Sequence, residues 1–189
     1  MSNDKFNWGI LGPGGIARAF AKDLTFIQGH AIAAVGSRSL DNAQKFSADF
    51  GGAAYGSYEE LVADPTVDAI YVATPHPAHH DNVILALNAG KPVLCEKPFA
   101  VNAQQAQAMV DVASRNQVAL VEAMWARFLP HYAKVREIVD SGVLGPILSI
   151  HADHGQRLAD QGIARLIEPA LAGGALLDLG IYAVSFAHM

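Results

Sequence analysis

The segment Gly12–Ala17 (GPGGIA) is the feature that most constrains how this chain can fold. It fits the pattern G-x-G-x-x-A, follows the apolar run Asn7–Leu11 and opens a stretch of helical period. In such a unit the first glycine permits a tight turn, the second lets the backbone approach a pyrophosphate, and the small last residue lets the helix pack closely. The helix N-terminus offers unpaired N–H groups to the phosphates. The segment predicts a dinucleotide site, with the phosphates at Gly12, Gly14, Gly15 and Ile16.

Short apolar runs alternate with longer stretches of helical period along the first two thirds of the chain. This alternation predicts crossover units and a doubly wound, mostly parallel α/β sheet. The runs are apolar throughout, which is typical of strands covered on both faces. The predicted strands are Asn7–Leu11, His30–Ser37, Ala69–Ala73, Pro92–Cys95 and Val118–Ala123. The predicted helices are Gly15–Phe26, Leu40–Phe50, His79–Ala89, Asn102–Asn116 and Leu129–Ser141.

The pattern changes after Pro146. Ile147–His154 has the composition of a strand, yet the remaining sequence offers it no partner. The run Ala175–Met189 is of helical type and carries no stop signal. We therefore expect a Rossmann domain over residues 1–123, followed over 124–189 by the incomplete beginning of an α+β substrate domain.

Composition excludes several classes of protein. Of the 189 residues, 51% are hydrophobic and 16% charged, and the net charge is -5, so neither a disordered chain nor a nucleic-acid-binding protein is expected. The single cysteine, Cys95, permits no internal disulfide. The N-terminus is too polar for a signal peptide, and no apolar run approaches the ~18 residues of a membrane span. We expect a soluble, cytoplasmic protein.

The end of the second predicted strand favours NADP over NAD, although NAD stays possible. An NAD site places a carboxylate there to bind the ribose 2′-hydroxyl. Here the residues are Ser37 and Arg38, and the first carboxylate is Asp41. Arg38 can pair with a 2′-phosphate, to which Ser37 can donate a hydrogen bond. The alternative is that Arg38 is a solvated loop charge.

Four further motifs follow the glycine segment in order. They are ATPH at 73–76 with His79, EKP at 96–98, EAMWARF at 122–128 and GGALLDLGIY at 173–182. Together they resemble the glucose–fructose oxidoreductase/inositol dehydrogenase (Gfo/Idh/MocA) family, in its branch of dimeric dihydrodiol dehydrogenases and NADP-dependent xylose dehydrogenases. The resemblance covers essentially the whole chain. Many members of the family carry histidine where this chain has Tyr182, which points toward the diol and sugar branch.

The resemblance implies a homodimer and assigns roles to individual residues. Lys97 would be the catalytic or substrate-orienting residue, and Asp178 and Tyr182 would complete the polar end of the site. The nicotinamide side would be lined by Thr74, Pro75, His76 and Glu96. The substrate pocket would be walled by Trp125, Arg127 and Phe128. His79 either lines the cofactor site or begins the following helix.

Spacing supports the last polar pair independently. Asp178 and Tyr182 are four residues apart, so on a helix they share one face. A nearby Lys97 ammonium would favour the phenolate of Tyr182, which could then exchange a proton with the substrate. Lys97 could equally transfer the proton itself while Tyr182 orients the substrate. The alternative for Asp178 is an ordinary helix carboxylate.

Two other possibilities carry less weight. A metal site at His76, His79 and His80 lacks the further ligands and spacing that zinc requires, so no metal is expected. Cys95 beside Glu96 should have a raised pKa, which argues against a nucleophile. The sequence thus predicts an NADP-dependent oxidoreductase acting on a sugar or trans-dihydrodiol. The alternative is a truncated cofactor-binding module without catalysis.

Overall fold

The computed structural model describes residues 5–158, 160 and 162–189. The chain divides into two compact units, one ending at Glu122 and the other beginning at Ala123. The sequence pattern predicts the division after residue 123. The first unit carries the whole dinucleotide-binding pattern.

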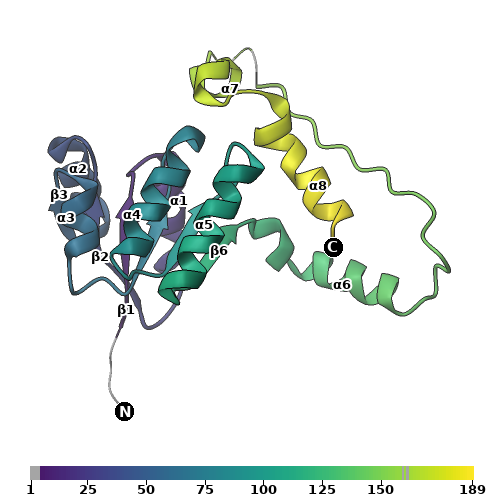
Figure 1. Cartoon of the computed structure of the whole chain (residues 1–189), viewed down its shortest axis with the longest axis horizontal. Helices are drawn as coiled ribbons and strands as arrows, with labels where there is room; N and C mark the ends of the chain where they lie inside the picture. The colour runs from purple at the N-terminus through teal and green to yellow at the C-terminus, as the bar shows by residue number, and fades with distance from the viewer. Residues whose placement is uncertain (1–4, 159, 161) are drawn as a thin grey trace. The chain divides into compact units, whose positions relative to one another are not determined.

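Six strands form one sheet among the described residues, in the order β3-β2-β1-β4-β5-β6 (Figure 1). The pairs β1–β2, β1–β4, β2–β3 and β4–β5 are all parallel. Chain order reverses at β1, which lies between β2 and β4, and ligands of open α/β sheets bind at such a switch point. The strands are β1 Phe6–Leu11, β2 His30–Gly36, β3 Ala53–Tyr55, β4 Ala69–Val72, β5 Val93–Glu96 and β6 Leu120–Ala123.

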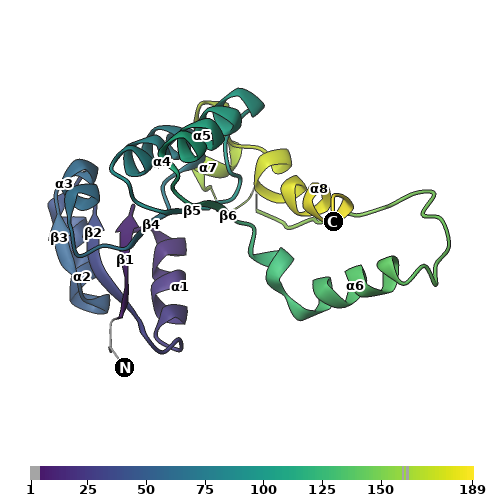
Figure 2. The same cartoon turned by 60° about the horizontal axis from the view of Figure 1, so that its bottom comes forward.

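Helices cover both faces of this sheet (Figure 2). Helices α3 (Tyr58–Ala63), α4 (His79–Asn88) and α5 (Ala103–Asn116) share one core with side chains of β4 and β5. Helix α1 (Gly15–Leu24) packs on the opposite face, with α2 (Leu40–Phe50) beside it. All of β4 is buried as a result, which confirms the prediction of strands covered on both faces.

The predicted doubly wound Rossmann fold is confirmed, and the predicted strands and helices of this unit end within two residues of the observed ones. β3 and α3, which are only three and six residues long, are not among the predicted elements. The Ser57 hydroxyl starts α3 by accepting the N–H of Glu60 at 3.2 Å. An N-cap serine of this kind is a local sequence signal for the start of a helix.

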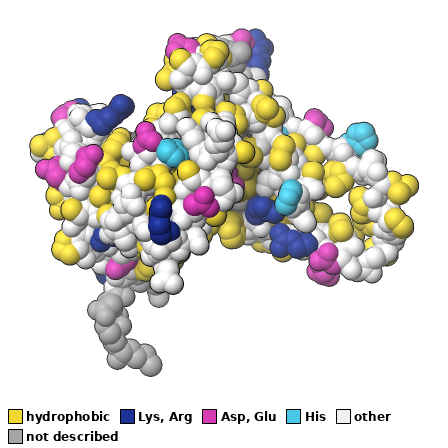
Figure 3. Space-filling model, viewed as in Figure 1, with side chains coloured by type: hydrophobic (Ala, Val, Ile, Leu, Met, Phe, Trp, Pro, Cys, Tyr) yellow, Lys and Arg dark blue, Asp and Glu magenta, His cyan; other side chains and the backbone are white. Residues whose placement is uncertain are grey.

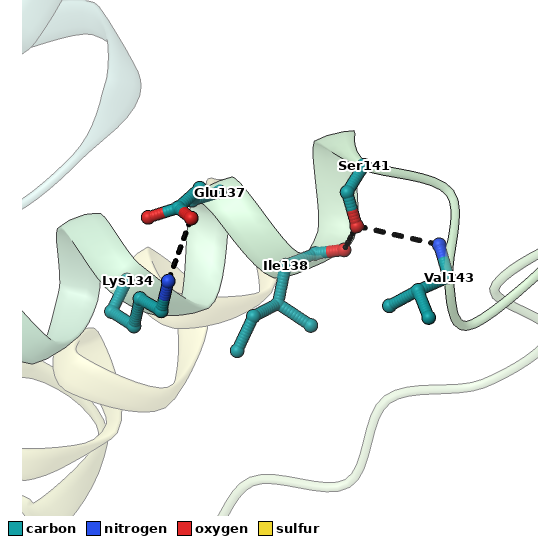
Figure 4. A network of polar contacts seen from close by, with 5 residues as sticks. All are labelled: Lys134, Glu137, Ile138, Ser141 and Val143. Carbon is teal, nitrogen blue, oxygen red and sulfur yellow. Dashed lines mark hydrogen bonds and ion pairs between the residues drawn. The ribbon is translucent and has the colours of Figure 1, made fainter.

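The second unit contains short helices joined by irregular segments. Helix α6 (Pro130–Asp140) carries an ion pair between Lys134 and Glu137 at 2.6 Å. At its end the Ser141 hydroxyl donates to the carbonyl of Ile138 at 2.6 Å and accepts the N–H of Val143 at 3.4 Å (Figure 4). The other elements are α7 (Ala164–Ile167), a 3₁₀ turn over Pro169–Leu171, a π-helical turn over Leu176–Gly180 and α8 (Ile181–Ala187).

The predicted strand at Ile147–His154 is wrong, because these residues adopt no regular structure and are all exposed. Leu148 alone is 93% exposed. A strand requires a partner for its backbone N–H and C=O groups, and none of the described residues pairs with this segment. Hydrophobic side chains accordingly lie at the surface of the segment that follows α6 (Figure 3).

One helical stretch, Pro169–Ala187, is long and apolar enough to cross a membrane by length and composition, with 19 residues and a mean hydropathy of 1.6. The expectation that no run approaches a membrane span is therefore wrong on these criteria. The stretch is broken at Ala172 and Gly174, which have φ values of 55° and 134°. A spanning helix must satisfy its backbone hydrogen bonds continuously, so the stretch is weak evidence for a membrane protein.

Candidate active site

The turn after β1 requires glycine at its first position for reasons internal to the chain. Gly12 has a φ of 93°, a region that residues with a Cβ rarely adopt. A Cβ at Gly12 would also lie 2.8 Å from the Thr74 methyl carbon, which is too close. The Gly12 N–H donates to the Gly36 carbonyl at 3.1 Å, which ties the turn to β2. The predicted tight turn is therefore present.

Neither Gly14 nor Gly15 is needed to avoid a steric clash within the chain. A Cβ at Gly14 would approach only the Ala73 carbonyl oxygen, at 4.0 Å, and one at Gly15 would meet nothing within 4 Å. Gly14 is the N-cap of α1, and the first turn of the helix presents N–H groups without intrahelical partners. Ala17 is fully buried, so the helix packs closely on the sheet. The turn thus leaves room where a pyrophosphate would need it, and the residues present fit a dinucleotide.

An open cleft of about 540 Å³ contains this turn and extends to the end of β2. It is lined by Gly12, Pro13, Gly14, Ser37, Arg38, Ser39, Asn42, Tyr58, Ala73, Thr74 and Pro75. The cleft thus brings together six predicted residues, whereas Gly15 and His76 are not among its lining residues. The six are Gly12, Gly14, Ser37, Arg38, Thr74 and Pro75. Ile16, on the first turn of α1, is half exposed and is not among the lining residues.

The β2 end of the cleft combines an exposed cation with polar groups. Arg38 is exposed, and the hydroxyl of the buried Ser37 accepts the N–H of Ser39 at 3.2 Å. Asp41, the nearest carboxylate in sequence, forms an ion pair with Lys45 at 2.6 Å. An anion in this end of the cleft therefore faces a guanidinium and the N-terminus of α2.

Two residues that line the cleft were not predicted from the sequence. Asn42 follows Ser39 by three residues and lies on the first turn of α2, whereas Tyr58 is the first residue of α3. The predicted helix start at Leu40 is a signal that could have found Asn42. Tyr58 lies in the region where no helix was predicted, so nothing placed it near the site.

Both ring nitrogens of His79 lie close to backbone carbonyl groups. Its side chain is fully buried, with Nε2 2.8 Å from the Thr74 carbonyl oxygen and Nδ1 2.9 Å from that of Pro98. Burial lowers the pKa of His79, although these backbone contacts oppose the shift. His79 begins α4, as one alternative held, and its contact with a cofactor stays a prediction. The side chain links the loop after β4 to the loop after Lys97.

Thr74 and His76 follow β4 in the same loop. The Thr74 hydroxyl accepts a hydrogen bond from the Asn82 amide at 3.0 Å, and both side chains are buried. His76 is also largely buried, in a 3₁₀ turn that ends at Ala78. The contacts that these residues would make with a nicotinamide stay a prediction.

Lys97 follows the last residue of β5 and is half-buried. The preceding Glu96 is 9% exposed, accepts the Lys97 N–H at 3.1 Å through Oε2, and accepts the Tyr71 hydroxyl through Oε1. Burial raises the pKa of Glu96, against the hydrogen bonds from Tyr71 and Lys97. Both carboxylate oxygens are thus bonded within the chain.

Cys95 is buried, and its pKa is raised, first by burial and then by the charges of Glu96 and Glu122. The direction that the sequence predicted is confirmed, although burial is a larger cause than Glu96. A thiol with a raised pKa carries little thiolate and is a poor nucleophile. Among the described residues, no group of three or more His, Cys, Asp or Glu side chains is arranged to hold a metal ion.

The second unit holds the other predicted residues. Trp125 Nε1 donates to the Tyr182 hydroxyl at 3.0 Å, and the two rings pack edge to face at 5.9 Å. Asp178 lies 3.6 Å from Arg165 in an ion pair. The structure thus brings Trp125 and Tyr182 together. The convergence of Tyr182 and Asp178 with Lys97, which belongs to the first unit, stays a prediction.

Three residues remain to be placed in this unit. The Arg127 guanidinium donates to the carbonyl oxygen of His188 at 3.3 Å, while Phe128 is 76% exposed. The ring of His154 packs 5.1 Å from that of Tyr182. Its position beside Tyr182 makes it a further candidate for the substrate side, one that the incorrect strand prediction obscured.

Comparison with known families gives two matches. Residues 6–124 match the family described as GFO_IDH_MocA, oxidoreductase family, NAD-binding Rossmann fold. Residues 132–189 match the GFO/IDH/MocA C-terminal domain. The two matches follow one another along the chain and together account for most of it.

Several curated proteins are similar to this chain over nearly all of its length. It is 44% identical to D-xylose 1-dehydrogenase (NADP(+)) of Hypocrea jecorina, an alignment that covers 95% of this chain and 51% of the relative. It is 44% identical to trans-1,2-dihydrobenzene-1,2-diol dehydrogenase of Mus musculus, with 96% of this chain and 55% of the relative covered. The chain therefore spans about half the length of these relatives.

Solved structures agree with the sequence comparison. The 3-ketoreductase KijD10 from Actinomadura kijaniata, in complex with NADP and TDP-benzene, superposes with a TM-score of 0.88 at 33% identity. That match covers 97% of this chain and 56% of the other. An NAD binding oxidoreductase from Klebsiella pneumoniae gives a TM-score of 0.80 at 28% identity, covering 97% and 52%.

Proposed function

The chain belongs to the Gfo/Idh/MocA oxidoreductase family, and from this membership we propose that it is an NADP-dependent oxidoreductase. Its substrate is a secondary alcohol of a sugar or of a trans-dihydrodiol, or the matching carbonyl compound. The observation that carries the proposal is that Gly14 and Arg38 line the same cleft. A side chain at position 14 would meet no close neighbour within the chain, so the fold alone does not explain this glycine. The names of the xylose and dihydrodiol dehydrogenases support the substrate class.

The glycine turn and Arg38 bind different parts of the dinucleotide. The first-turn N–H groups of α1 and the positive end of its dipole bind the pyrophosphate, which the missing side chain at Gly14 lets approach. Arg38 pairs with the 2′-phosphate, because a guanidinium matches phosphate oxygens with two parallel hydrogen bonds. Asp41 does not oppose this, since Lys45 balances its charge.

The nicotinamide supplies the hydride chemistry when it is bound. The residues of the chain orient the substrate and handle its proton. Lys97 donates a hydrogen bond to the reacting oxygen, and either Lys97 or Tyr182 takes up or returns the proton as the alcohol and carbonyl interconvert. Trp125 holds the Tyr182 hydroxyl through its 3.0 Å hydrogen bond, which fixes the position of that phenol.

The test is NADPH formation on mixing the chain with NADP and a panel of pentoses, hexoses and trans-dihydrodiols. Lys97→Met should abolish turnover and leave NADP affinity nearly unchanged, because the change removes the ammonium and not the cleft. Lys134→Met, an exposed lysine of α6, is the matched control and should turn over like the parent. No turnover on any substrate would reject the enzyme assignment, whereas a Lys97→Met variant that keeps the parent rate would remove Lys97 from the chemistry.

A second candidate function is a cofactor-binding module without catalysis. It is favoured by the observation that the chain spans about half the length of its relatives. Titrating NADPH and assaying turnover on the same sample separates the two: binding with turnover supports the enzyme, and binding without turnover supports the module. A homodimer and a cytoplasmic location stay predictions.

A further inference from the structure

Tyr71 is a polar residue in an otherwise apolar, completely buried strand. It lies in β4 between Ile70 and Val72, and its backbone pairs with Leu94 of β5. Side chains alternate along strands, so Tyr71 and Glu96 project from the same face of the sheet. The Tyr71 ring is 2% exposed and stacks on Phe20 of α1, with centroids 4.2 Å apart.

The Tyr71 hydroxyl completes a buried chain of hydrogen bonds that ends at Lys97. The hydroxyl donates to Oε1 of Glu96, and Oε2 of Glu96 accepts the backbone N–H of Lys97 at 3.1 Å. The carboxylate thus joins the middle of β4 to the first residue beyond β5. A buried carboxylate with both oxygens bonded has little freedom to rotate, so the backbone of Lys97 is fixed.

Packing alone does not account for the hydroxyl. A phenylalanine at position 71 would stack on Phe20 equally well and would bury no polar group. Burying a polar group costs free energy unless that group is hydrogen-bonded. The other titratable groups near Glu96 are Cys95, which precedes it in β5, and Lys97, which follows it in the next loop. The charge of Glu122 in β6 acts on Cys95. The helix packed against Tyr71 contributes Phe20, which carries no charge.

We propose that Tyr71 is a positioning residue for Lys97 and acts through Glu96. Its hydroxyl holds the carboxylate in the orientation that anchors the Lys97 backbone, which in turn directs the Lys97 ammonium toward the substrate oxygen. The inference rests on the proposed function for the role of Lys97 in the chemistry. The hydrogen-bond chain itself can be tested without any turnover.

The chain provides a matched control in Tyr55. Its hydroxyl donates to Oδ2 of Asp64 at 3.1 Å, so it forms a second tyrosine–carboxylate pair in the same unit. Tyr55→Phe removes the same atom from the end of β3, where Asp64 bonds to Thr66. An effect of Tyr71→Phe that Tyr55→Phe does not share therefore reports on the Lys97 anchor.

The experiment compares both variants with the parent in the full chain. Amide hydrogen exchange measured by NMR should show that the Lys97 N–H exchanges about tenfold faster in Tyr71→Phe than in the parent. Its exchange rate should be unchanged in Tyr55→Phe. The factor of about ten is expected because the loss of a hydrogen bond to a charged group changes an equilibrium constant by this factor or more. In the activity assay kcat should fall about tenfold in Tyr71→Phe, with KM for NADP unchanged. Glu96→Gln, which keeps the Tyr71 hydroxyl but cannot accept both hydrogen bonds, should reproduce both effects.

An exchange rate of the Lys97 N–H that is the same in all variants would overturn the proposal. So would equal losses of kcat in Tyr71→Phe and Tyr55→Phe, because these would indicate a general loss of stability. If the parent chain shows no turnover, the proposed function fails, and the exchange rate of Lys97 still decides whether Tyr71 anchors it. Should Tyr71→Phe not fold, Glu96→Gln decides by the same two measurements.

Discussion

Replacing single glycines of the turn after β1 separates the requirements of the fold from those of the ligand. Gly12→Ala forces alanine to a φ of 93° and places its Cβ 2.8 Å from the Thr74 methyl carbon. The left-handed backbone costs roughly 1–2 kcal/mol, and overpacking adds typically 1–3 kcal/mol. We therefore expect Gly12→Ala to lower the free energy of unfolding by roughly 2–5 kcal/mol.

Gly14→Ala should behave in the opposite way. Gly14 has a φ of -81° and a ψ of -172°, which alanine adopts easily, and its Cβ would stay 4.0 Å from the nearest atom. A less flexible unfolded chain contributes about 0.4–1 kcal/mol of stability, which offsets the weaker N-cap of alanine, a loss of about 0.5–1 kcal/mol. The free energy of unfolding should change by less than about 0.5 kcal/mol.

The cofactor affinity of Gly14→Ala should nevertheless fall at least about tenfold, or about 1.4 kcal/mol, because the new methyl group occupies the approach of the pyrophosphate. Urea unfolding measures the stability, and titration of NADPH fluorescence measures the affinity. If Gly14→Ala binds NADPH as tightly as the parent, the pyrophosphate does not lie against Gly14, and the proposed phosphate site is wrong.

Two further predictions concern charge. Arg38→Asp should weaken NADP binding by at least about tenfold more than NAD binding, because a carboxylate repels the 2′-phosphate; equal losses in parallel titrations would remove Arg38 from that phosphate. Burial would raise the pKa of Asp64, but hydrogen bonds from Thr66 and Tyr55 and the charge of Lys91 lower it overall. A carboxyl group with a lowered folded-state pKa stabilises the protein above its unfolded pKa, and this contribution is lost as the pH falls through the folded-state value. Asp64→Asn should therefore destabilise the protein at neutral pH and progressively less below the ordinary value of 3.8 in urea unfolding, whereas a pH-independent difference would contradict the account.

Five of the six strands were predictable because they are short, continuously apolar runs separated by helices of clear period. β3 and α3 were missed because three and six residues are too few to show a period. Ile147–His154 shows the opposite error. Its composition suits a strand, but a strand depends on partners that a local pattern cannot supply.

The site was predictable where a motif depends on the conformation of the backbone, as it does at Gly12. It was less predictable where burial decides the role of a side chain. His79 belongs to a recognisable motif, yet the motif does not show that its side chain is completely buried between two carbonyl oxygens. Asn42 and Tyr58 reach the cleft through the folding of α2 and α3, which no motif records.

A crystal structure of the chain with NADP bound would show where each part of the dinucleotide lies. We expect the pyrophosphate against the backbone of Gly14, the 2′-phosphate on Arg38, and the nicotinamide ring beside Thr74 and Lys97. A dinucleotide bound away from the glycine turn, or one whose nicotinamide lies far from Lys97, would show that the proposed cofactor site is wrong.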